Sequence, residues 1–452
     1  MISRPSASRA LDFQIDCVST GAIRLAAWSP RASGQGTTPH YLPQNVSASR
    51  YCVRMSRYRL IPSPAHEAVL RDHCAHARYV WNLAVEQYSH WHPGRKGAPG
   101  YPEQCRQLTA ARAEHDWLRE GSHVVQQQAL RDFTQAMAAF FDQTNPVRPP
   151  SWRKAGRNEG FRIVGLKPWH VRRLSRNIGQ IWVPKAGWVR FRWSRAVPTG
   201  VTSYRVTCDR AGRWHVAFAA IPAPVPAPGD GQVVGIDRGV AVSVALSTGE
   251  LLHVIGLTGR ERARLRRLER RLARAERGSG RRGQVRLALA RLRAREADRR
   301  KDWAEKASTD IARRFDLIRV ENLRIKNMIR SAKGARVTPG RGVRPKAGLN
   351  REILRSGWGL LVRRLEEKAP GQVEKVNAAF TSQRCSACGQ VDPKSRESQA
   401  VFRCTSCGYA CHADVNAAIN TAAGHAVTAR GGCRDAGPVN REPHLLTSFT
   451  GR

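Results

Sequence analysis

The sequence predicts a mixed α/β protein built from several domains, and three features of the chain support this fold class. At 452 residues the chain is about three times as long as a typical domain of ~150 residues. Stretches with apolar residues at helical spacing alternate with short runs of β-branched and aromatic residues. The Pro-rich segment IPAPVPAPGDG at 221–231 separates two such regions and is typical of a stiff linker.

The region before this linker combines helical and strand-like stretches. Residues 1–54 are rich in Ser, Arg, Ala and Gly without a sustained period, so we expect a disordered leader or an overextended start upstream of Met55. Residues 65–159 carry apolar residues at helical spacing and predict a helical subdomain. Short strand-like runs in 55–64 and 160–228, separated by Gly, Pro and Asp turns, predict a small β-barrel.

The region after the linker begins with the strand VVGID, which ends at Asp237 and precedes two alternating strands. This meander is expected at the start of an RNase H-like fold. The strand FDLIRVE ends at Glu321, and a basic loop at 330–348 precedes an amphipathic helix at 351–369. QVEKVNAAF predicts another strand, and HADVNAAINTAA a short helix with Asp414 in its first turn. Such a sheet places Asp237 and Glu321 on adjacent strand ends, with Asp414 approaching from the flanking helix.

The charge of the chain indicates its partner. There are 77 Lys and Arg residues against 35 Asp and Glu residues, a formal net charge of +42, which favours nucleic acid as the partner. Residues 260–301 predict a helical hairpin broken by RGSGRRG, with Leu at its seam and Arg elsewhere. Because so many unpaired Arg side chains repel one another without phosphates nearby, a helix pair that binds a nucleic-acid backbone is favoured over a solvated face. Charge alone also fits a ribosome-associated structural protein or a charge-driven binder.

The cysteines indicate a metal rather than disulfides. Four of the 11 form two Cys-x-x-Cys-Gly pairs, Cys385 with Cys388 and Cys404 with Cys407. Four thiolates complete a tetrahedral zinc site with no open position, which is typical of structural zinc, and Cys411 and His412 are weaker candidates for that reason. This pattern favours a reducing compartment, so we expect a cytoplasmic protein. We expect neither secretion nor membrane insertion, because the first residues lack a signal-peptide core and no apolar run reaches 18 residues.

Three carboxylates in ordered segments indicate a second metal site, although a lone Asp at a strand end is usually only a turn former. Hydrolysis of a phosphodiester uses two divalent ions about 3.5–4 Å apart to activate water and stabilise the leaving oxygen. Clustered carboxylates hold such ions. Asp237, Glu321 and Asp414 are therefore candidate ligands for Mg²⁺, with Mn²⁺ as an alternative.

Taken together, these motifs resemble one family. GIDRG around Asp237, VENL around Glu321, and SQRCSACG, FRCTSCG and HADVNAAIN nearer the C-terminus are similar to the three RuvC motifs and the zinc ribbon of TnpB proteins. These are transposon-encoded relatives of type V CRISPR nucleases. The resemblance spans nearly everything from Met55 to Gly424. The second motif reads Glu-Asn where Glu-Asp is commoner in the family, but the metal-binding Glu is retained.

The resemblance implies an RNA-guided endonuclease that acts as a monomer with a guide RNA from the transposon end. It would cut double-stranded DNA beside a short adjacent motif, while pairing with the guide supplies sequence specificity. By position in the motifs, Asp237, Glu321 and Asp414 inherit the metal-binding catalytic roles, and the four cysteines inherit zinc. Tyr101 and Gln127 fall where the family contacts the adjacent motif.

The implied architecture has six parts. They are a disordered leader (1–54), a wedge β-barrel (55–64 and 160–228), a helical recognition domain (65–159), an RNase H-like RuvC nuclease domain (229–384 and 410–424), a zinc ribbon (385–409) and a disordered tail (425–452). Trp152, Trp188 and Trp193 stand among basic residues, where they could stack on bases, but we expect them to fill the barrel core.

Three other functions stay open on the sequence. A miniature type V CRISPR effector differs from a transposon nuclease mainly in its genomic neighbourhood and guide source. A guided DNA-binding regulator arises by loss of the acidic residues, and all three are present here. A plain basic RNA-binding protein predicts no Mg²⁺-dependent cutting and no effect of Asp237→Ala beyond stability.

Overall fold

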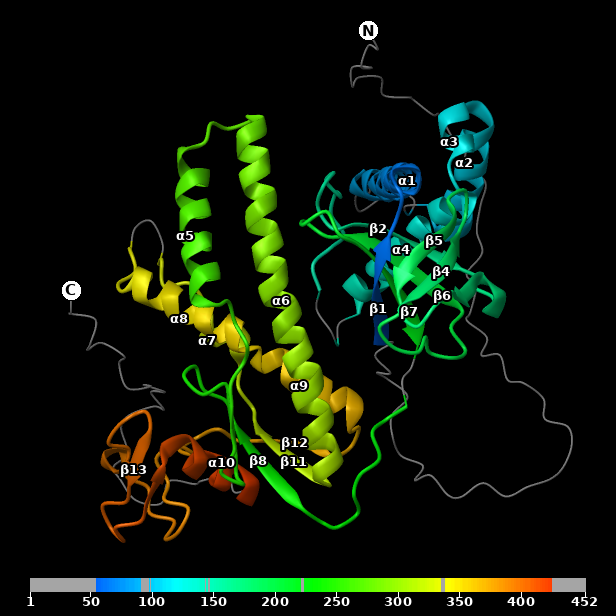
Figure 1. Cartoon of the computed structure of the whole chain (residues 1–452). Coiled ribbons are helices and arrows are strands. Elements are labelled where there is room, and N and C mark those ends of the chain that lie inside the picture. The colour runs from blue at the N-terminus through cyan, green and yellow to red at the C-terminus, as the bar shows by residue number, and fades with distance from the viewer. Residues whose placement is uncertain are drawn as a thin grey trace, which may run out of the picture. The chain divides into compact units, whose positions relative to one another are not determined.

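The computed structural model describes residues 54–90, 97, 99–142, 144, 147–220, 223–334 and 338–424. The tail predicted at 425–452 and the leader predicted at 1–54, apart from Arg54, lie outside the described residues. Helices and strands occur in both halves of the described chain, which confirms the mixed α/β class (Figure 1). Within the described residues no helix has the length and apolar character that a membrane span needs.

The first half contains a seven-stranded antiparallel sheet in the order β2-β6-β7-β1-β5-β4-β3. Its strands are β1 (Arg54–Ile61), β2 (Glu159–Val164), β3 (Val171–Arg173), β4 (Ile178–Val183), β5 (Gly187–Arg192), β6 (Ser203–Cys208) and β7 (Trp214–Ala220). The strand predicted after Met55 thus joins those predicted in 160–228. The order runs from β2 at one end to β3 at the other, so closure into a barrel stays a prediction.

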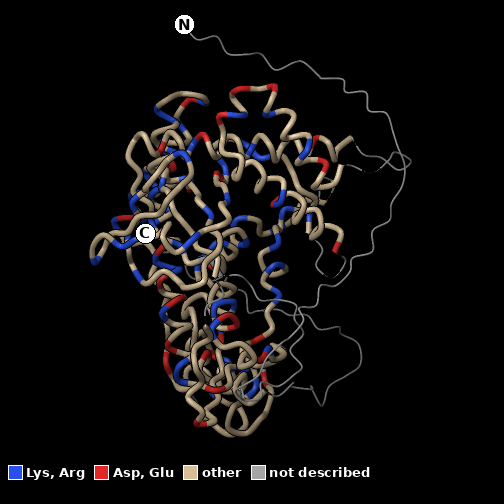
Figure 2. Tube along the Cα trace, turned by 90° about the vertical axis from the view of Figure 1, so that its right-hand side faces the viewer, with Lys and Arg blue, Asp and Glu red and all other residues tan. Residues whose placement is uncertain are grey.

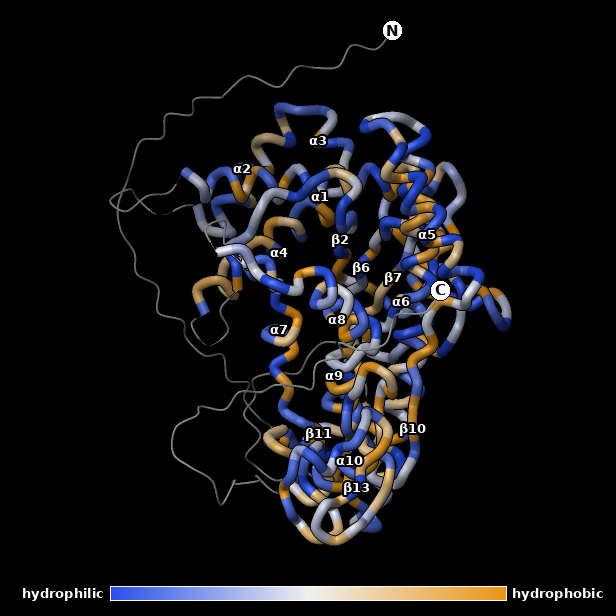
Figure 3. The backbone as a smooth tube through the Cα atoms, turned by 90° about the vertical axis from the view of Figure 1, so that its left-hand side faces the viewer, coloured by the Kyte–Doolittle hydropathy of each residue, from blue (hydrophilic) through white to orange (hydrophobic). Residues whose placement is uncertain are grey.

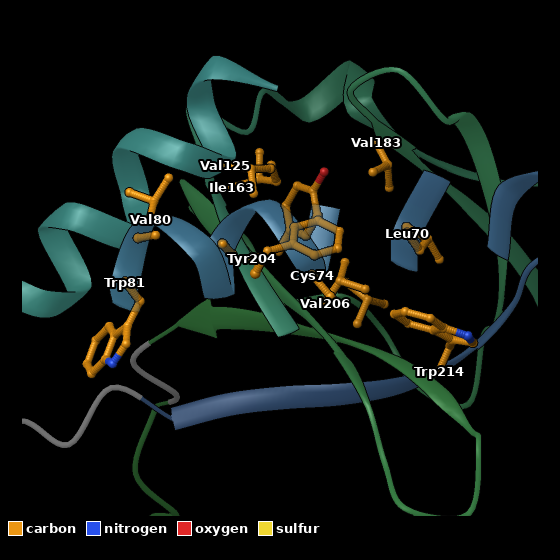
Figure 4. Close-up of a cluster of buried hydrophobic side chains, with 14 of the residues drawn as sticks. Leu70, Cys74, Val80, Trp81, Val125, Ile163, Val183, Tyr204, Val206 and Trp214 are labelled. Atoms are coloured by element: carbon orange, nitrogen blue, oxygen red, sulfur yellow. The ribbon is translucent and has the colours of Figure 1, made fainter. Parts of the chain in front are cut away.

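Four helices accompany this sheet: α1 (Pro64–Ser89), α2 (Tyr101–Glu114), α3 (Asp116–Glu120) and α4 (His123–Phe141). Helix α1 begins where Ser63 accepts a hydrogen bond from the His66 backbone N–H at 3.2 Å and Pro64 takes the first position. Side chains from the helices and from the sheet share one core, and Figure 4 shows Val80 and Val125 close to Ile163 and Tyr204. The helices predicted in 65–159 are present, but they do not form a core of their own, and a separate helical domain stays a prediction.

The second half is built on a five-stranded sheet in the order β10-β9-β8-β11-β12. Its strands are β8 (Val233–Asp237), β9 (Val244–Leu246), β10 (Leu251–Leu252), β11 (Leu317–Glu321) and β12 (Val373–Val376). Strands β8, β11 and β12 run parallel to one another, whereas β9 and β10 are antiparallel to their neighbours. The three predicted strands and the meander are all confirmed.

The second half also contains helices, of which α6, α9 and α10 pack on this sheet. The helices are α5 (Gly259–Arg274), α6 (Gly280–Arg314), α7 (Ile325–Met328), α8 (Val343–Ser356), α9 (Trp358–Lys368) and α10 (Ala413–Ala423). Val234 and Ile236 of β8 are fully buried in a core shared with Ile311 of α6 and Leu361 and Leu365 of α9. Because side chains alternate along a strand, Gly235 faces the other way, toward α10.

Two details of the second half differ from the sequence prediction. The single helix predicted at 351–369 is two helices, because Gly357 adopts φ +75°, a left-handed conformation that ends α8 before α9 begins. The predicted loop at 330–348 is helical from Val343 onward. The hairpin predicted at 260–301 is confirmed as α5 and α6, although α6 continues to Arg314. Figure 3 shows hydrophobic positions recurring between hydrophilic ones along α5.

The cysteine-rich module lies between β12 and α10. It contains a short 3₁₀ turn, η2 (Pro393–Ser395), and the two-stranded ribbon β13 (Val401–Arg403) and β14 (Ala410–His412). Phe402, Cys385 and Cys404 are buried together in a small core of its own. A module this small has little apolar surface to bury, so a bound metal would contribute much of its stability.

Candidate active site and metal centre

Asp237 and Glu321 are the last residues of two neighbouring parallel strands, β8 and β11. Ile236 pairs with Val320, so the two acidic residues leave the sheet at the same edge. Ile236 and Val320 point into the core below the sheet, and the residues that follow them therefore point to the opposite face. That face is the one covered by α10, as predicted.

Helix α10 brings Asp414 to this edge, and Gly235 allows the helix to approach. A Cβ atom at Gly235 would lie 2.0 Å from the Ala418 carbonyl oxygen and 2.3 Å from the Ala422 nitrogen, so any other residue would push α10 off the sheet. Asp414 lies in the first turn of α10, and a Cβ atom at Gly239 would lie 3.6 Å from its Oδ2. The Asp414 carboxylate therefore sits over the turn that follows Asp237.

Neighbouring groups hold the acidic side chains in place. The Thr381 hydroxyl donates a hydrogen bond to Oε1 of Glu321 at 2.7 Å. Arg238 donates to the Glu321 backbone carbonyl. Arg396, which comes from the cysteine-rich module, donates to Oδ1 of Asp414 at 2.9 Å and forms a largely buried ion pair with it. Hydrogen bonds of this kind restrict the rotamers of the two carboxylates before any ligand binds.

The three carboxylates interact electrostatically. Burial raises the pKa of Asp237 well above its usual range, the negative charges of Glu321 and Asp414 raise it further, and Arg396 lowers it. Glu321 and Asp414 are only 7 % and 5 % exposed. Ionising Asp237 beside two other carboxylates is costly, and a bound cation would lower this cost. The structure thus brings together the three residues that the sequence predicts to meet.

The three carboxylates do not close around a single point. Among the described residues, their oxygens do not all lie within 4.8 Å of one another, the distance that the four cysteine sulfurs satisfy. Carboxylate oxygens are the ligands that Mg²⁺ and Mn²⁺ prefer, and the donor set therefore fits these cations.

The four predicted cysteines form one cluster, with all four sulfur atoms within 4.8 Å of one another. The sulfurs of Cys385 and Cys407 are 3.7 Å apart, and those of Cys388 and Cys404 are 3.6 Å apart. Tetrahedral coordination with Zn–S bonds of ~2.3 Å requires S–S separations of about 3.8 Å, so the cluster could hold one zinc ion with little movement. The backbone N–H of Cys407 points at the Cys404 sulfur and lowers the pKa of that thiol to about 6. Although the Tyr409 backbone lowers the pKa of Cys407, the neighbouring thiols raise it to about 12, so Cys404 is the first of the two to form a thiolate.

The two weaker zinc candidates have other positions. Cys411 lies in β14 outside the cluster, and burial raises the pKa of its thiol. His412 caps α10, because its Nδ1 accepts a hydrogen bond from the Asp414 backbone N–H at 3.2 Å. His412 thus links the ribbon to the acidic site, since it fixes the first turn that carries Asp414.

Tyr101 and Gln127 belong to two helices that pack against each other, α2 and α4. Tyr101 is the first residue of α2, and the Arg131 guanidinium lies 5.5 Å from the centre of its ring. Gln127 precedes Arg131 by one helical turn, so both side chains lie on the same face of α4. The two residues therefore share a neighbourhood, and both are half-buried.

The hairpin α5–α6 carries a basic surface. Leu265 and Leu268 of α5 pack against Val285 and Leu289 of α6, which leaves the other faces to charged residues. Several arginines of α6 are neutralised, since Arg299 pairs with Glu261 and Arg293 with Glu269. In α5 a stripe of exposed arginines forms no ion pair within the described residues: Arg264, Arg267 and Arg271. Figure 2 shows Lys and Arg spread along most of the described chain.

The prediction for the tryptophans is right for one of three. Trp193 packs against the core and stacks on Phe191 with ring centres 5.5 Å apart. Trp152 is 52 % exposed, and Trp188 lies half-buried on the outer face of β5. Trp188 was misplaced because strand alternation, which separates it from its buried neighbour Val189, depends on a register that the sequence alone leaves unassigned. Trp152 lies outside the helices and strands, in the segment between α4 and β2.

Three residues of the site were not predicted from the sequence: Arg238, Thr381 and Arg396. Arg238 directly follows Asp237, and Thr381 precedes the first cysteine pair by a few positions, so proximity to a motif was the signal available. Arg396 gave no such signal, because it lies 18 residues before Asp414 and reaches it only through the fold of the ribbon.

Comparison with family models gives three matches along the chain. Residues 54–96 match a helix-turn-helix domain, residues 215–332 match the family described as a probable transposase (OrfB_IS605), and residues 358–421 match the Cas12f1-like TNB domain. The transposase match includes Asp237 and Glu321. The TNB match includes Asp414 and the four cysteines.

Two curated relatives align over most of their length. The chain is 34% identical to the putative RNA-guided DNA endonuclease InsQ of Escherichia coli strain K12, with 87% of this chain and 98% of the relative covered. It is 32% identical to a putative RNA-guided DNA endonuclease of Streptomyces pristinaespiralis, with 88% and 94% covered. Among solved structures, a Cas12f1–sgRNA–target DNA complex is similar at 14% identity and a TM-score of 0.45, over 78% of this chain and 81% of that one.

Proposed function

The chain belongs to the TnpB family of transposon-encoded RNA-guided DNA endonucleases, and from this premise we propose that it cuts double-stranded DNA at the cluster of Asp237, Glu321 and Asp414. The observation that carries the proposal is the convergence of these carboxylates from β8, β11 and α10 at one edge of the second sheet. A guided regulator without cleavage has no use for three buried acids, which are costly to keep together.

In this proposal the three carboxylates hold divalent cations, which supply an activated water and charge stabilisation at the leaving oxygen. The residues of the chain position the ligands. Thr381 orients Glu321 through its hydroxyl, and the cap by His412 fixes the turn that carries Asp414. Arg396 neutralises part of the acidic charge, and its guanidinium is suited to hold a phosphate of the DNA near the cations.

The cysteine cluster has a structural role in this proposal. Zinc held by Cys385, Cys388, Cys404 and Cys407 leaves no open position for a substrate. It fixes the module that supplies Arg396 and leads into α10. Loss of zinc would therefore affect the active site through the position of these two elements.

The partners proposed are a guide RNA and a double-stranded DNA target, bound by one copy of the chain. The unpaired arginines of α5 suit phosphates of the guide or of its hybrid with DNA, which they bind without reading sequence. Tyr101 and Gln127 are the proposed contacts to the adjacent motif, because an amide side chain can bond base edges in the major groove. In this proposal the sheet β1–β7 belongs to the wedge domain, and residues 65–159 form the recognition domain.

The deciding experiment combines RNA sequencing with cleavage. RNA that copurifies with the full chain is sequenced, and a plasmid library that carries the matching target beside randomised bases is incubated with the complex and Mg²⁺. We expect double-strand breaks beside one short motif. The absence of cuts in any library member, with guided binding intact, would instead support a regulator. A CRISPR array next to the gene would support the CRISPR effector over the transposon nuclease.

A matched variant separates cutting from binding. Asp237→Ala should abolish cleavage and leave guided DNA binding nearly intact, because it removes a metal ligand and few phosphate contacts. Binding is measured by gel shift with the same guide and target. Equal loss of cleavage and binding would contradict the proposed division between the acidic cluster and the basic surfaces.

A further inference from the structure

The turn that follows Asp237 lies beside Asp414 and has no regular secondary structure. Residues 238–243 connect β8 to β9 and belong to no helix or strand. A Cβ atom at Gly239 would lie 3.6 Å from Oδ2 of Asp414 and 2.8 Å from the Val242 carbonyl oxygen. A small movement of this turn would therefore change the distance between the carboxylates of Asp237 and Asp414.

Two side-chain hydrogen bonds hold the backbone around this turn. The Arg238 guanidinium donates to the Glu321 carbonyl oxygen, which ties the start of the turn to the end of β11. The Trp358 indole Nε1–H donates to the Gly239 carbonyl oxygen at 3.0 Å. This second bond comes from outside the sheet, because Trp358 is the first residue of α9. Through Trp358, α9 thus contacts the turn beside the acidic site.

The position of Trp358 is fixed by α9. Trp358 shares one face of this helix with Leu361 and Leu365, because residues three and seven positions apart lie on the same side. Both leucines are buried in the core on the face of the sheet opposite α10. The Trp358 ring is only 4 % exposed, and Gly357 before it adopts φ +75°, which sets where α9 begins. The indole N–H is therefore held at one end of a packed helix.

A buried indole N–H needs an acceptor wherever it lies, so the hydrogen bond alone does not indicate a role in the reaction. Trp81 makes the same kind of bond to the Ser151 carbonyl at 2.9 Å, where it ties α1 to the segment before β2. The Gly239 carbonyl differs from such an acceptor because the turn that carries it lies next to Asp414. Loss of the Trp358 bond should therefore affect the acidic site as well as stability.

We propose that Trp358 is a positioning residue for cleavage, whose indole N–H holds the turn 238–243 so that Asp237 and Asp414 keep the separation that bound cations require. The inference rests on the proposed function, since it takes these carboxylates as cation ligands. Without the bond, the Gly239 carbonyl would lack its donor, and the turn would rotate or admit water to satisfy it. Partners of this kind orient metal ligands without touching the metal.

Two variants separate the N–H of Trp358 from the bulk of its ring. Trp358→Phe keeps a six-membered ring and removes the donor, whereas Trp358→His keeps an N–H at an equivalent position of a five-membered ring and removes the bulk. Calorimetry measures the Mg²⁺ affinity of the full chain freed of RNA at about pH 8, where an imidazole is neutral. We expect Trp358→Phe to weaken Mg²⁺ binding about tenfold, and Trp358→His to weaken it less.

The same variants are compared in guided cleavage and guided binding. With guide and target in excess and Mg²⁺ present, Trp358→Phe should cut about ten- to hundredfold more slowly, while its gel shift with the target stays unchanged. Trp303→Phe is the matched control, because Trp303 is also buried in the second half and the substitution is the same. It should lower the Tm and leave the Mg²⁺ affinity and the cleavage rate unchanged.

The order of the variants decides the assignment. If the indole only fills space, Trp358→His should be worse than Trp358→Phe, and that result would overturn the proposal. Losses in Trp358→Phe no larger than those in Trp303→Phe would overturn it as well. Asp237→Ala shows which Mg²⁺ binding belongs to the acidic cluster. Mg²⁺ binding unaffected by Asp237→Ala would overturn the proposed function itself, whereas Asp237-dependent binding that Trp358→Phe leaves intact would overturn this inference alone.

Discussion

The Asp237 side chain shows how a catalytic arrangement opposes stability. Its pKa is raised by burial and by the carboxylates of Glu321 and Asp414. A raised folded-state pKa means that the folded protein keeps a proton that the unfolded chain has already released. Stability is therefore lost as pH rises from the unfolded pKa through the folded one, and it remains reduced at neutral pH. A bound divalent cation would offset this loss because it neutralises the same charges.

A thermal unfolding experiment tests this balance. Without divalent cations at neutral pH, Asp237→Asn should raise the free energy of unfolding by about 1–2 kcal/mol, because it removes one of three repelling charges. Mg²⁺ should raise the Tm of the wild-type chain and have much less effect on the variant. Asp316→Asn is the control, since the Gly229 backbone N–H lowers the pKa of Asp316 and its loss should destabilise. A wild-type Tm that does not change when Mg²⁺ is added would contradict the expected binding of a cation at the three carboxylates.

Arg396 makes the opposite contribution, because it supplies a positive charge where the cations would bind. Its ion pair with Asp414 is largely buried and is therefore weakly screened by water. Arg396→Gln should tighten Mg²⁺ binding to the apo protein at least about tenfold, measured by calorimetry or by the Mg²⁺ dependence of the Tm. Arg403→Gln is the control, because Arg403 pairs with Glu397 on the exposed side of the same ribbon. Weaker Mg²⁺ binding in Arg396→Gln would show that the arginine organises the site rather than competing for it.

At the scale of elements, the contact between α10 and β8 delivers Asp414 to the sheet. Gly235→Ala places a methyl group 2.0 Å from the Ala418 carbonyl, and the helix must move away. We expect a destabilisation of about 1–3 kcal/mol and a loss of Mg²⁺-dependent cleavage, because the carboxylates no longer meet. Gly256→Ala is the control, since a Cβ there meets nothing within 4 Å. Full cleavage by Gly235→Ala would mean that the helix position is not critical.

The zinc ribbon allows an equally direct comparison between two cysteines of one module. Cys385→Ser removes a member of the four-sulfur cluster, and structural zinc contributes directly to folding, so the variant should contain less zinc and unfold at lower temperature. Cys411→Ser changes a thiol outside the cluster and should retain the metal. Zinc content is measured by mass spectrometry alongside the Tm. Full activity after thorough removal of zinc would argue against the structural role.

The sequence predicts the helices and strands of this protein better than the contacts between them. The strands ending at Asp237 and Glu321 and the helix of Asp414 follow from apolar periodicity and lie where expected. The break at Gly357 could not be deduced, because a single glycine inside an apolar helical pattern usually costs stability without ending the helix. The contact between Arg396 and Asp414 depends on the path of the ribbon, which no local pattern encodes.

At the scale of the whole molecule, the arginines behind the net charge of +42 do not all contribute equally to the binding of a polyanion. Arginines that pair with carboxylates, as Arg299 does with Glu261, contribute to the fold and little to the external field. Unpaired arginines on α5 repel one another in the free chain, so their cost is recovered only when phosphates bind. A bound RNA should therefore stabilise the whole chain, and the unpaired arginines should account for most of the salt dependence of its binding.

Two triple variants with the same change in formal charge test this division. Replacing Arg264, Arg267 and Arg271 by Gln removes the unpaired stripe of α5, and each lost phosphate contact should reduce the slope of log Kd against log salt for guide RNA by about 0.7 where the RNA is single-stranded. The control replaces three ion-paired arginines of α6 by Gln: Arg293, Arg295 and Arg299. Its slope should change by less than about 1 in total, because Glu269 and Glu261 offset two of these three positive charges. Equal changes in both variants would mean that RNA binding depends on net charge alone, and the hairpin would then have no role beyond its contribution to the total.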